Sequence, residues 1–472
     1  MSKIVRFNIL QFDKLISVEQ QLVDAKERPE VTNKLRKLVF FAQREGLVRT
    51  SKKILSKGGA FQLKKFQTII TVEVNEKLFV NFSTQTSENP LHFVVRNEFF
   101  ETTSAITFLN ISEDINFNQF IESTTDKSIK LPVSEYANQE ISYAENGVFL
   151  YGLGDYARVY IAPNINAENK SFCVDYNHSL ATHYKENYKY QQYGLVPEES
   201  YSALKKTKKP LAIIATYHSD HTRIAREIFE RNPSAFIFVE KPPCVTLEDI
   251  QTLASLYDQG ANLEIGYNRR FIPLNQKIRD TFYNQQKVIT ISVKEILITE
   301  NHWYFWPNQG TRITGNLTHW LDLAVFWING EPVEINLMAS PSKDETMAVS
   351  VLFSDGSLVN ITVSDKGNSL RGVQENIEVR TKDETVNIQD YTRYSWTSIN
   401  GRKFTVNKSI RNKGHDAMYK HLVKAYHNKA EVKYTREDLL KSALTTFYVS
   451  KMYKEGIRNL NLYDKTKDFH SK

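Results

Sequence analysis

The strongest constraint on the fold is a series of short, wholly apolar runs between residues 147 and 270. The runs cover residues 148–151, 172–174, 211–215 and 235–239. A strand reads as a continuous apolar run when both of its faces are buried, as in a parallel sheet covered by helices. Segments with helical periodicity lie between the runs, as at residues 224–229 and 247–257. This alternation predicts a doubly wound α/β domain at residues 147–270.

The residues before this segment have a different pattern. Helical spacing is followed by runs rich in Val, Ile, Phe and Thr, which are typical of strands. The predicted helices cover residues 31–42 and 51–55, and the predicted strands cover 68–74, 78–82 and 92–95. A polar stretch at 123–146 has the composition of a linker. We therefore predict an extra N-terminal α+β module at residues 1–146.

The residues after the segment are rich in strand signals. Predicted strands cover 288–298, 333–338, 346–353, 358–363 and 376–380, and predicted helices cover 415–426 and 436–455. Asp355-Gly356 predicts a type I′ hairpin. Thr435 suits the N-cap of the last helix, and Gly456 suits the position after its end. The prediction for residues 271–472 is a C-terminal α/β domain with an open, mainly antiparallel sheet.

Composition limits the function classes. The chain has 472 residues, a formal net charge of +7 and two cysteines, Cys173 and Cys244. Two cysteines cannot form a disulfide framework, which favours a reducing, cytoplasmic location. No apolar run reaches the roughly 18 residues of a membrane span. The charge excess is scattered, so we expect a small-molecule partner rather than nucleic acid or a membrane.

A glycine motif, Gly152-Leu-Gly154-Asp-Tyr-Ala157, follows the first apolar run. Its first glycine suits a tight turn, its second lets a pyrophosphate approach the backbone, and Ala157 permits close helix packing. Asp175 ends the next run about 20 residues later, where a carboxylate binds the ribose hydroxyls of NAD. It would repel the 2′-phosphate of NADP, and Tyr176 beside it adds no positive charge. We therefore predict NAD as the cofactor, in preference to NADP.

Glu240-Lys241-Pro242 follows the run that ends at residue 239. A lysine at the carboxyl end of a parallel strand can point into the ligand crevice, where it would bind a substrate hydroxyl and the nicotinamide ribose. The same position also suits a lysine that extends its ammonium group into solvent. This motif alone leaves both interpretations open.

Five motifs in order resemble the Gfo/Idh/MocA oxidoreductases, a family that includes sugar and inositol dehydrogenases. They are Gly152-x-Gly154-x-x-Ala157, Ala215-Thr-Tyr-His-Ser-Asp-His221, Glu240-Lys241-Pro242, Gly266-Tyr-Asn-Arg-Arg-Phe271 and His319-x-x-Asp322. The resemblance covers roughly residues 147–456. It implies a Rossmann domain followed by a domain whose open sheet packs the substrate over the nicotinamide. That sheet often joins subunits, so a homo-oligomer, a dimer or tetramer, is expected.

The resemblance also implies roles for single residues. Lys241 and His319 would move the proton of the reacting hydroxyl, a task that suits the near-neutral pKa of histidine. The implied cofactor-binding residues are Gly152, Gly154, Asp155, Tyr156, Ala157, Asp175, Tyr176, Thr216, Tyr217, His218, His221, Glu240, Lys241, Pro242 and Asn268. The implied substrate-binding residues are Lys241, Tyr267, Arg269, Trp303, Arg312 and His319. No metal site is expected.

The aromatic residues 303–306 allow two interpretations. Trp303 and its neighbours would stack on the apolar face of a sugar ring, or they would form a hydrophobic plug between the domains. Arg312 would pair with a carboxylate or a phosphate of the substrate.

Two positions depart from the family pattern. Many relatives have an Asp where Gly315 stands, and a polysaccharide-associated branch, which resembles residues 309–319, has a Glu where Asn316 stands. An amide cannot act as a general base at neutral pH, but it can orient a hydroxyl or a water. We include Asn316 among the catalytic residues in that role, which leaves proton transfer to Lys241 and His319.

The same branch often carries a zinc-dependent alcohol-dehydrogenase-like domain at its N-terminus, and residues 28–37 and 44–50 resemble a helical passage of it. Residues 1–146 contain one histidine, His92, and no cysteine. Catalytic zinc needs three protein ligands. A working domain of that kind is excluded, and a degenerate remnant or a replacement module remains.

Two functions therefore follow from the sequence. The first is an NAD(P)-dependent oxidoreductase acting on a hydroxyl or keto group of a sugar, nucleotide sugar or cyclitol, in cell-surface polysaccharide biosynthesis. The second is a non-redox nucleotide-binding scaffold or partner protein of a carbohydrate pathway, in which the missing acid abolishes turnover.

Overall fold

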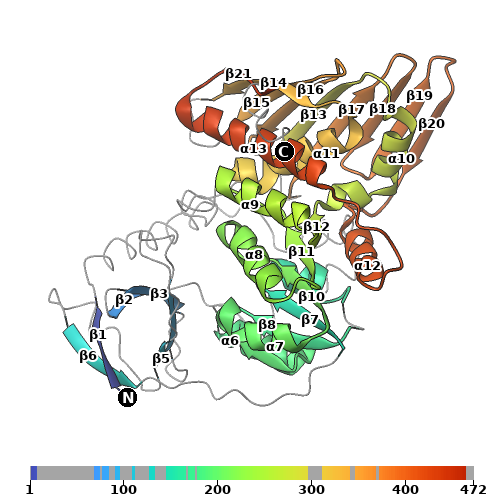
Figure 1. The fold of residues 1–472 in the computed structure, drawn as a ribbon. Coiled ribbons are helices and arrows are strands. Elements are labelled where there is room, and N and C mark those ends of the chain that lie inside the picture. The colour runs from blue at the N-terminus through green and yellow to red at the C-terminus, as the bar shows by residue number, and fades with distance from the viewer. Residues whose placement is uncertain are drawn as a thin grey trace.

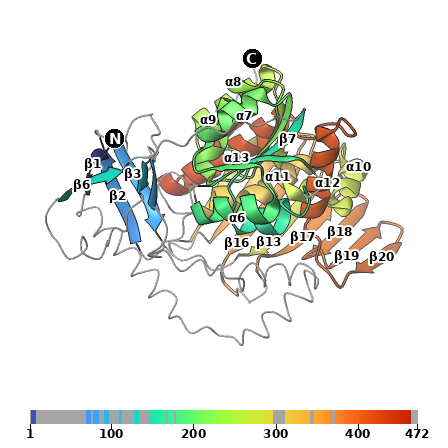
Figure 2. The ribbon, with the colours of Figure 1, turned by 90° about the horizontal axis from the view of Figure 1, so that it is seen from below.

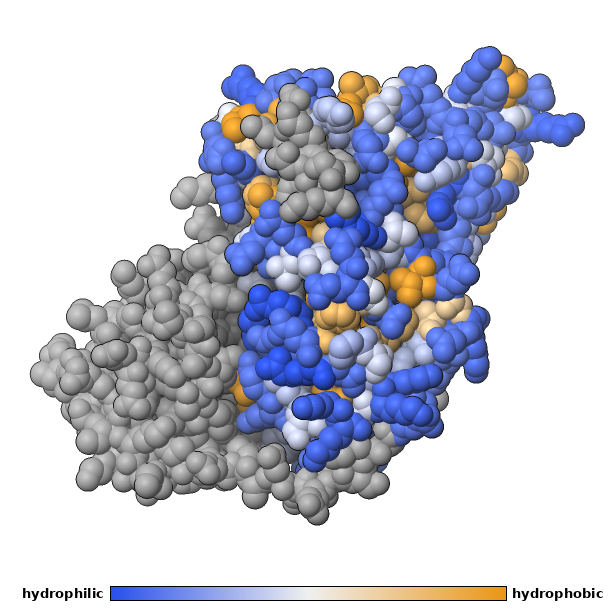
Figure 3. All heavy atoms as spheres, in the orientation of Figure 1, coloured by the Kyte–Doolittle hydropathy of each residue, from blue (hydrophilic) through white to orange (hydrophobic). Residues whose placement is uncertain are grey.

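The computed structural model describes residues 145–165, 168–175, 178–295, 311–340, 346–367 and 372–463, together with the backbone of six strands between residues 2 and 132. Its strands form three sheets, most of whose strands are labelled in Figure 1. Among these residues, no helix has the length and apolar character needed to cross a membrane. In Figure 3 the described surface is mainly hydrophilic, and its apolar residues form small separate groups.

The first sheet is antiparallel. It contains β1 (Ser2–Phe7), β2 (Thr68–Val74), β3 (Lys77–Ser83), β4 (Leu91–Val95), β5 (Leu109–Ile111) and β6 (Lys127–Pro132) in the order β5-β4-β3-β2-β1-β6. The strands predicted at residues 68–74, 78–82 and 92–95 are confirmed as β2, β3 and β4. The helices predicted at 31–42 and 51–55 lie outside the described residues.

The second sheet is the predicted doubly wound sheet, and all its strand pairs are parallel. It contains β7 (Asn146–Tyr151), β8 (Lys170–Val174), β9 (Gln192–Gly194), β10 (Lys209–Ile214), β11 (Phe236–Glu240) and β12 (Asn262–Gly266) in the order β12-β11-β10-β7-β8-β9. Side chains from one strand alternate between two hydrophobic cores, as on Phe149 and Leu150. Both faces are therefore buried, which explains the continuous apolar runs.

Helices cover the two faces of this sheet. One face carries α7 (Tyr201–Lys206), α8 (His221–Arg231) and α9 (Leu247–Asp258), and the other carries α6 (His178–Tyr188) and α12 (His415–Tyr426) (Figure 2). Thr246 caps α9 through a capping box with Asp249. The alternation of strand and helix thus produces the architecture that the apolar runs predicted.

Helix α12 lies far along the chain, in the range predicted for the C-terminal domain, and yet it packs on the parallel sheet. Met418, Tyr419 and Leu422 are fully buried in the core that also contains Leu150. At its start, Gly414 has a φ of +86°, and a Cβ there would lie 2.2 Å from a backbone oxygen. The helix therefore returns the chain to the parallel sheet.

The third sheet has nine strands. It contains β13 (Val288–Lys294), β14 (Pro332–Ala339), β15 (Met347–Phe353), β16 (Leu358–Ser364), β17 (Gln374–Arg380), β18 (Glu384–Gln389), β19 (Arg393–Ser398), β20 (Lys403–Asn407) and β21 (Asn459–Asn461) in the order β20-β19-β18-β17-β13-β16-β15-β14-β21. Only the β13–β16 pair is parallel. The prediction of a mainly antiparallel sheet is confirmed.

One face of the nine-stranded sheet is covered by α10 (Pro273–Phe282), α11 (Thr318–Trp327) and α13 (Arg436–Glu455) (Figure 1). On β13, Ile289, Ile291 and Val293 are buried toward these helices, while the residues between them are exposed. The predicted bounds of α12 and α13 are confirmed, and Thr435 caps α13. The other face of the sheet is polar.

The predicted type I′ turn between β15 and β16 is wrong, although the hairpin itself is present. Gly356 has a φ of +81°, whereas Asp355 does not have a positive φ. Gly356 N–H donates to the Phe353 carbonyl at 2.9 Å, and Phe353 N–H donates to the Ser357 carbonyl at 2.9 Å. The connection is longer by one residue than a type I′ turn, so only its last residue needs the left-handed conformation.

Candidate active site

The glycine motif forms the turn that leaves β7 at the carboxyl edge of the parallel sheet. Gly152 has a φ of +87°, and a Cβ there would lie 2.2 Å from the Ala215 carbonyl oxygen, so only glycine fits. A Cβ at Gly154 would meet no atom within 4 Å, so the backbone is open to approach from outside. Ala157 is buried in the core below the turn. The turn therefore has the shape that a pyrophosphate requires.

The helical segment after the turn is shorter than the motif predicts. It is a π-helix of five residues, η2 (Ala157–Ile161). Asp155 forms an ion pair with Arg158, and the Tyr156 ring lies 5.0 Å from the Tyr160 ring. Both predicted cofactor-binding side chains, Asp155 and Tyr156, thus have partners inside the protein. A dinucleotide would contact mainly the backbone of the turn.

Asp175 follows β8, as predicted, and its carboxylate faces the glycine turn. Its Oδ2 accepts a hydrogen bond from the Leu153 backbone N–H at 2.7 Å. One carboxylate oxygen therefore holds the turn in place, and the side chain remains half-exposed. The structure brings Asp175 to the edge where the ribose of a dinucleotide would lie, but Tyr176 lies outside the described residues.

The predicted residues after β10 are Thr216, Tyr217, His218 and His221. His221 is buried, with its Nδ1 2.8 Å from the Pro242 carbonyl oxygen and its Nε2 3.2 Å from the Thr216 carbonyl oxygen. Burial lowers the pKa of His221, and the two carbonyl contacts act against that change. His221 therefore links the loops that follow β10 and β11, a structural task that the motif did not reveal.

Lys241 follows β11 at the same edge. Its Nζ donates a hydrogen bond at 2.9 Å to the carbonyl of Gly315, in the π-helical segment η7 (Ile313–Leu317) that precedes α11. The Lys241–Pro242 peptide bond is cis. Burial lowers the pKa of the ammonium group, and the Glu240 carboxylate opposes this change. The lysine therefore reaches the π-helical segment before α11, which is one of the helices on the nine-stranded sheet.

Glu240 is buried beside this lysine. Its Oε1 accepts a hydrogen bond from the Tyr419 hydroxyl, and its Oε2 lies 3.4 Å from the Lys241 backbone N–H. Burial raises the pKa of Glu240. Gly266 leaves space for the carboxyl group, because a Cβ there would lie 3.0 Å from it. Sequence reasoning missed Tyr419, which is 179 residues away and comes to the site through the packing of α12.

His319 lies in the first turn of α11, with its ring 6.2 Å from that of Tyr267. The Tyr267 hydroxyl is 2.6 Å from Thr318 Oγ1, which fixes the tyrosine ring. Burial lowers the pKa of His319 well below its ordinary value, and the positive charges of Arg269 and Lys241 act in the same direction. The ring is neutral at pH 7, and its Nδ1 makes no hydrogen bond with the described residues. His319 is therefore ready to accept a proton.

Asn316 lies one turn before His319, next to Gly315. Its Nδ2 donates a hydrogen bond at 2.9 Å to Oε2 of Glu295, a residue that directly follows β13 and is fully buried. Sequence reasoning did not include Glu295 in the site. The only signal was an acid at a position where the strand alternation predicts an inward, apolar side chain.

Three further predicted residues are buried, and two of them, Asn268 and Arg269, bind protein groups. Asn268 Nδ2 donates to the Lys413 carbonyl at 2.6 Å, and Arg312 is buried. Arg269 forms two hydrogen bonds with the buried carboxylate of Glu375, at 2.9 and 3.1 Å. Burial acts to raise the pKa of Glu375, but Arg269 and Lys413 outweigh it and lower the pKa to about 2. The Arg269 guanidinium is largely engaged before any substrate arrives.

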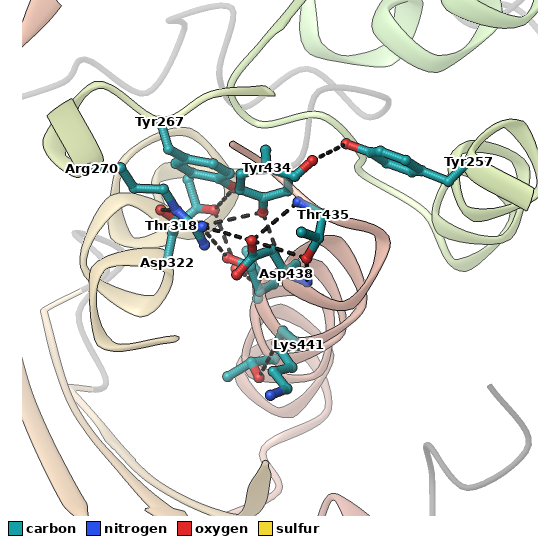
Figure 4. Close-up of polar contacts among 12 residues, drawn as sticks. Tyr257, Tyr267, Arg270, Thr318, Asp322, Tyr434, Thr435, Asp438 and Lys441 are labelled. Atoms are coloured by element: carbon teal, nitrogen blue, oxygen red, sulfur yellow. Dashed lines mark hydrogen bonds and ion pairs between the residues drawn. The ribbon is translucent and has the colours of Figure 1, made fainter. Parts of the chain in front are cut away.

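The aspartate of the His319 motif belongs to a second buried network (Figure 4). Arg270 forms two hydrogen bonds with Asp322, at 2.9 and 2.8 Å, and an ion pair with Asp438 at 3.0 Å. Asp322 also accepts hydrogen bonds from Ser442 at 3.0 Å and from Tyr434 at 3.2 Å. This network joins η5 (Asn268–Phe271), α11 and α13. Asp322 therefore fixes the helix that carries His319.

The structure thus brings Lys241, His319, Tyr267 and Asn316 together at the carboxyl edge of the parallel sheet, the edge at which the glycine turn also lies. Trp303 and the rest of the segment 303–306 lie outside the described residues. Within the described part of the chain, no group of three or more His, Cys, Asp or Glu side chains could hold a metal ion.

A cavity of about 580 Å³ opens on the polar face of the nine-stranded sheet, lined by Lys294, Gln374, Gln389 and Arg393 among others. None of the predicted site residues contributes to its lining. The cavity is therefore a separate feature of the surface.

No protein-family model matches the chain, and no curated protein sequence matches it. Its fold, however, is similar to that of several solved oxidoreductases. A levoglucosan dehydrogenase solved with NADH and levoglucosan is 13% identical, with a TM-score of 0.57, over 67% of this chain and 99% of that one. An aldose-aldose oxidoreductase from Caulobacter crescentus, complexed with glycerol, is 18% identical, with a TM-score of 0.56, over 67% and 99%.

An oxidoreductase from Agrobacterium radiobacter, in complex with NAD⁺, L-tartaric acid and magnesium, is 14% identical, with a TM-score of 0.54, over 68% of this chain and 100% of that one. At these identities the likeness shows the fold. It confirms the predicted α/β fold with a Rossmann-type parallel sheet, and the chemistry has to be argued from the residues themselves.

Proposed function

We propose that this chain is an NAD-dependent oxidoreductase that interconverts a hydroxyl and a keto group on a sugar, nucleotide sugar or cyclitol. One observation carries the proposal. Lys241, at the carboxyl end of a parallel strand, binds Gly315, four residues before a half-buried neutral histidine, His319. A cation and a proton acceptor thus flank the crevice where open α/β sheets bind ligands.

The residues at the neighbouring turn fit a dinucleotide. The open backbone at Gly154 accommodates a pyrophosphate, and the Asp175 carboxylate lies beside it. A negative charge there suits the ribose hydroxyls of NAD and disfavours the phosphate of NADP. The similar structures that were solved with NADH or NAD⁺ support the same choice.

When bound, the nicotinamide supplies the acceptor or donor of the hydride. The residues of this chain position the substrate and move its proton. The Lys241 ammonium group donates a hydrogen bond to the oxygen of the reacting hydroxyl and favours its ionisation. Neutral His319 is the proton acceptor, and burial together with nearby cations keeps the ring unprotonated before the reaction. In the reverse direction the protonated histidine returns that proton to the carbonyl oxygen.

The finer features of the proposal rest on the family resemblance. They are a place in cell-surface polysaccharide biosynthesis and a homo-oligomer joined through the nine-stranded sheet. They also include the division of the chain at residues 146 and 270, with residues 1–146 as a separate module. The levoglucosan bound to one similar structure, and the description of another as an aldose-aldose oxidoreductase, support the substrate class.

Two measurements test this function. Purified protein is titrated with NAD and with NADP in a calorimeter, and a panel of sugars, nucleotide sugars and cyclitols is screened for NADH absorbance at 340 nm. We expect NAD to bind more tightly than NADP and at least one substrate class to reduce NAD. Tight NAD binding with no turnover across the panel would favour the non-redox scaffold instead, and absence of binding would refute both.

A further inference from the structure

Position 316 bears on the proposed function, because it holds an amide where the polysaccharide-associated branch of the resembling family holds a glutamate. We infer that Glu295 supplies the missing carboxylate as a positioning residue, which orients Asn316 toward the substrate and keeps Lys241 charged. The inference rests on the proposed function for its role in turnover, but its structural part can be tested separately.

The first argument is the hydrogen bond between the two side chains. Asn316 Nδ2 lies 2.9 Å from Glu295 Oε2. An ionised carboxylate only accepts hydrogen bonds, so the amide nitrogen must face it, and the usual uncertainty between amide nitrogen and oxygen disappears. The amide oxygen of Asn316 therefore points away from Glu295. It is an acceptor of fixed orientation, suited to a substrate hydroxyl.

The second argument is the position of Glu295 on its strand. The inner face of β13 carries Ile289, Ile291 and Val293, all buried against the helices, and Glu295 continues this alternation. Its exposed fraction is 0%. A hydrophobic residue would satisfy the packing at this place, whereas a buried carboxylate loses hydration and needs compensating partners. An acid here is costly for folding, which indicates a task in the site.

The third argument is the shared contact with η7. Lys241 Nζ binds the carbonyl of Gly315 at 2.9 Å, and Glu295 binds the side chain of the next residue. The carboxylate and the ammonium group therefore approach the same turn from two different strands. The negative charge of Glu295 attracts the ammonium group of Lys241, and this attraction favours the protonated lysine.

The other charged groups around Lys241 act in both directions. Glu240 favours the ammonium form, Arg269 disfavours it, and Glu295 favours it. His319 is affected by Lys241 itself and also by Arg269, His415 and Lys413, all of which disfavour its protonation. Glu295 is thus one of two acids that balance a group of cations. Removing the charge of Glu295 should therefore lower the pKa of Lys241, so that more of the lysine is neutral at pH 7, without changing the shape of the site.

The experiment measures the reactivity of Lys241 in the apoprotein. Acetic anhydride acylates the neutral amine, and mass spectrometry quantifies the peptide that contains Lys241 at a series of pH values. In Glu295→Gln, which keeps the size of the side chain, the rate at neutral pH should rise on the order of tenfold, as expected for the loss of a nearby opposite charge. The control Glu334→Gln, on β14, should not change it.

A double variant separates charge from packing. Glu295→Gln with Asn316→Asp exchanges acid and amide across the same hydrogen bond, so a carboxylate remains beside η7. Its Lys241 should react within about threefold of the wild-type rate. If thermal unfolding shows that Glu295→Gln does not fold, the double variant serves as the test. A Lys241 acetylation rate in the double variant about tenfold above that of the wild type would then overturn the inference.

The two proposals fail in different ways. An unchanged labelling rate in folded Glu295→Gln refutes the role of Glu295, whatever the enzyme activity. A faster rate in a protein with no activity on any substrate leaves the role of Glu295 in place and refutes the dehydrogenase. Where activity is found, Glu295→Gln should shift the pH dependence of kcat/KM toward lower pH, whereas a purely structural loss would lower kcat at every pH.

Discussion

The buried ion pair between Arg269 and Glu375 joins η5 to β17, and it can be tested by removing the charge of one partner. Glu375 is fully buried, and its carboxylate accepts hydrogen bonds from Arg269 at 2.9 and 3.1 Å and from Trp320 Nε1 at 2.6 Å. Lys413 Nζ lies 3.4 Å from it. We therefore consider Glu375→Gln, which keeps the size of the side chain and removes its charge.

The expected loss follows from the burial of these charges. The side chains of Arg269 and Glu375 are 4% and 0% exposed, so solvent does not screen the pair. Removing one partner of such a pair lowers the free energy of unfolding by about 3–5 kcal/mol, because the other charge stays buried. With an m-value of about 3 kcal/mol/M, a loss of about 3 kcal/mol moves the urea midpoint down by about 1 M.

The assay is urea unfolding followed by tryptophan fluorescence, since Trp320 is part of the cluster. The matched control is Glu378→Gln on the same strand, β17, where the exposed carboxylate pairs with Arg380 at 3.1 Å. An exposed pair of this kind contributes about 0.2–1 kcal/mol. Equal midpoints for the two variants would refute our account of the buried cluster.

The same pair predicts a pH dependence. Its partners lower the pKa of Glu375 from 4.5 to about 2 in the folded protein. A lowered carboxyl pKa adds stability that is present above about pH 4.5 and is lost as the pH falls toward 2. The difference in unfolding free energy between wild type and Glu375→Gln should therefore shrink over this interval. A difference that stays constant from pH 6 to pH 2.5 would contradict the lowered pKa.

Three other substitutions test the proposed chemistry. Asp175→Ala should weaken NAD binding by about 1–3 kcal/mol, because a charged hydrogen-bond acceptor is lost, and should reduce the preference for NAD over NADP in calorimetry. His319→Ala should lower kcat by roughly 10²–10⁴-fold in steady-state kinetics while leaving NAD affinity nearly unchanged, and a near-normal kcat would move the proton transfer elsewhere. Gly152→Ala should abolish NAD binding and lower the thermal midpoint, because its Cβ would lie 2.2 Å from a carbonyl oxygen.

Local signals in the sequence explain what could be predicted about the fold. The apolar runs lie in a sheet buried on both faces, so their pattern depends only on the strands themselves. The bounds of α13 were predictable because Thr435 and Gly456 are capping residues whose preferences are short-range. The glycine at 152 was predictable for the same reason, because its turn is formed by neighbours in sequence.

Other features depend on contacts that no local pattern records. Strands β18, β19 and β20 were not predicted, because they carry polar residues on the face that the helices leave uncovered. The type of the hairpin turn was predicted wrongly. Asp355-Gly356 suits both a two-residue type I′ loop and a three-residue loop that ends in a left-handed glycine, and the structure has the second. The place of α12 on the parallel sheet is likewise a tertiary fact, decided by its apolar face after the chain has crossed the other domain.

The candidate site divides in the same way. Lys241 and His319 belong to ordered motifs, and the structure places them at one edge. Glu295, Tyr419 and Glu375 come from three distant segments and have no motif of their own. Each of them contacts a motif residue only because the sheet and helices bring it there. Sequence motifs predict the reacting groups better than they predict the groups that set the charge of those residues.

The electrostatics of the site follow from this second set of residues. Lys241 is flanked by two acids, Glu240 and Glu295, which favour its charged form against the effect of burial. Burial lowers the pKa of His319, and the charges of Arg269 and Lys241 act in the same direction. When the surroundings keep one of two neighbouring groups protonated and the other neutral, the first can donate a hydrogen bond and the second can act as a base. In the proposed reaction the acids therefore act on the histidine through the lysine. In this proposal the carboxylate that position 316 lacks is supplied by Glu295, which directly follows β13 and contacts Asn316.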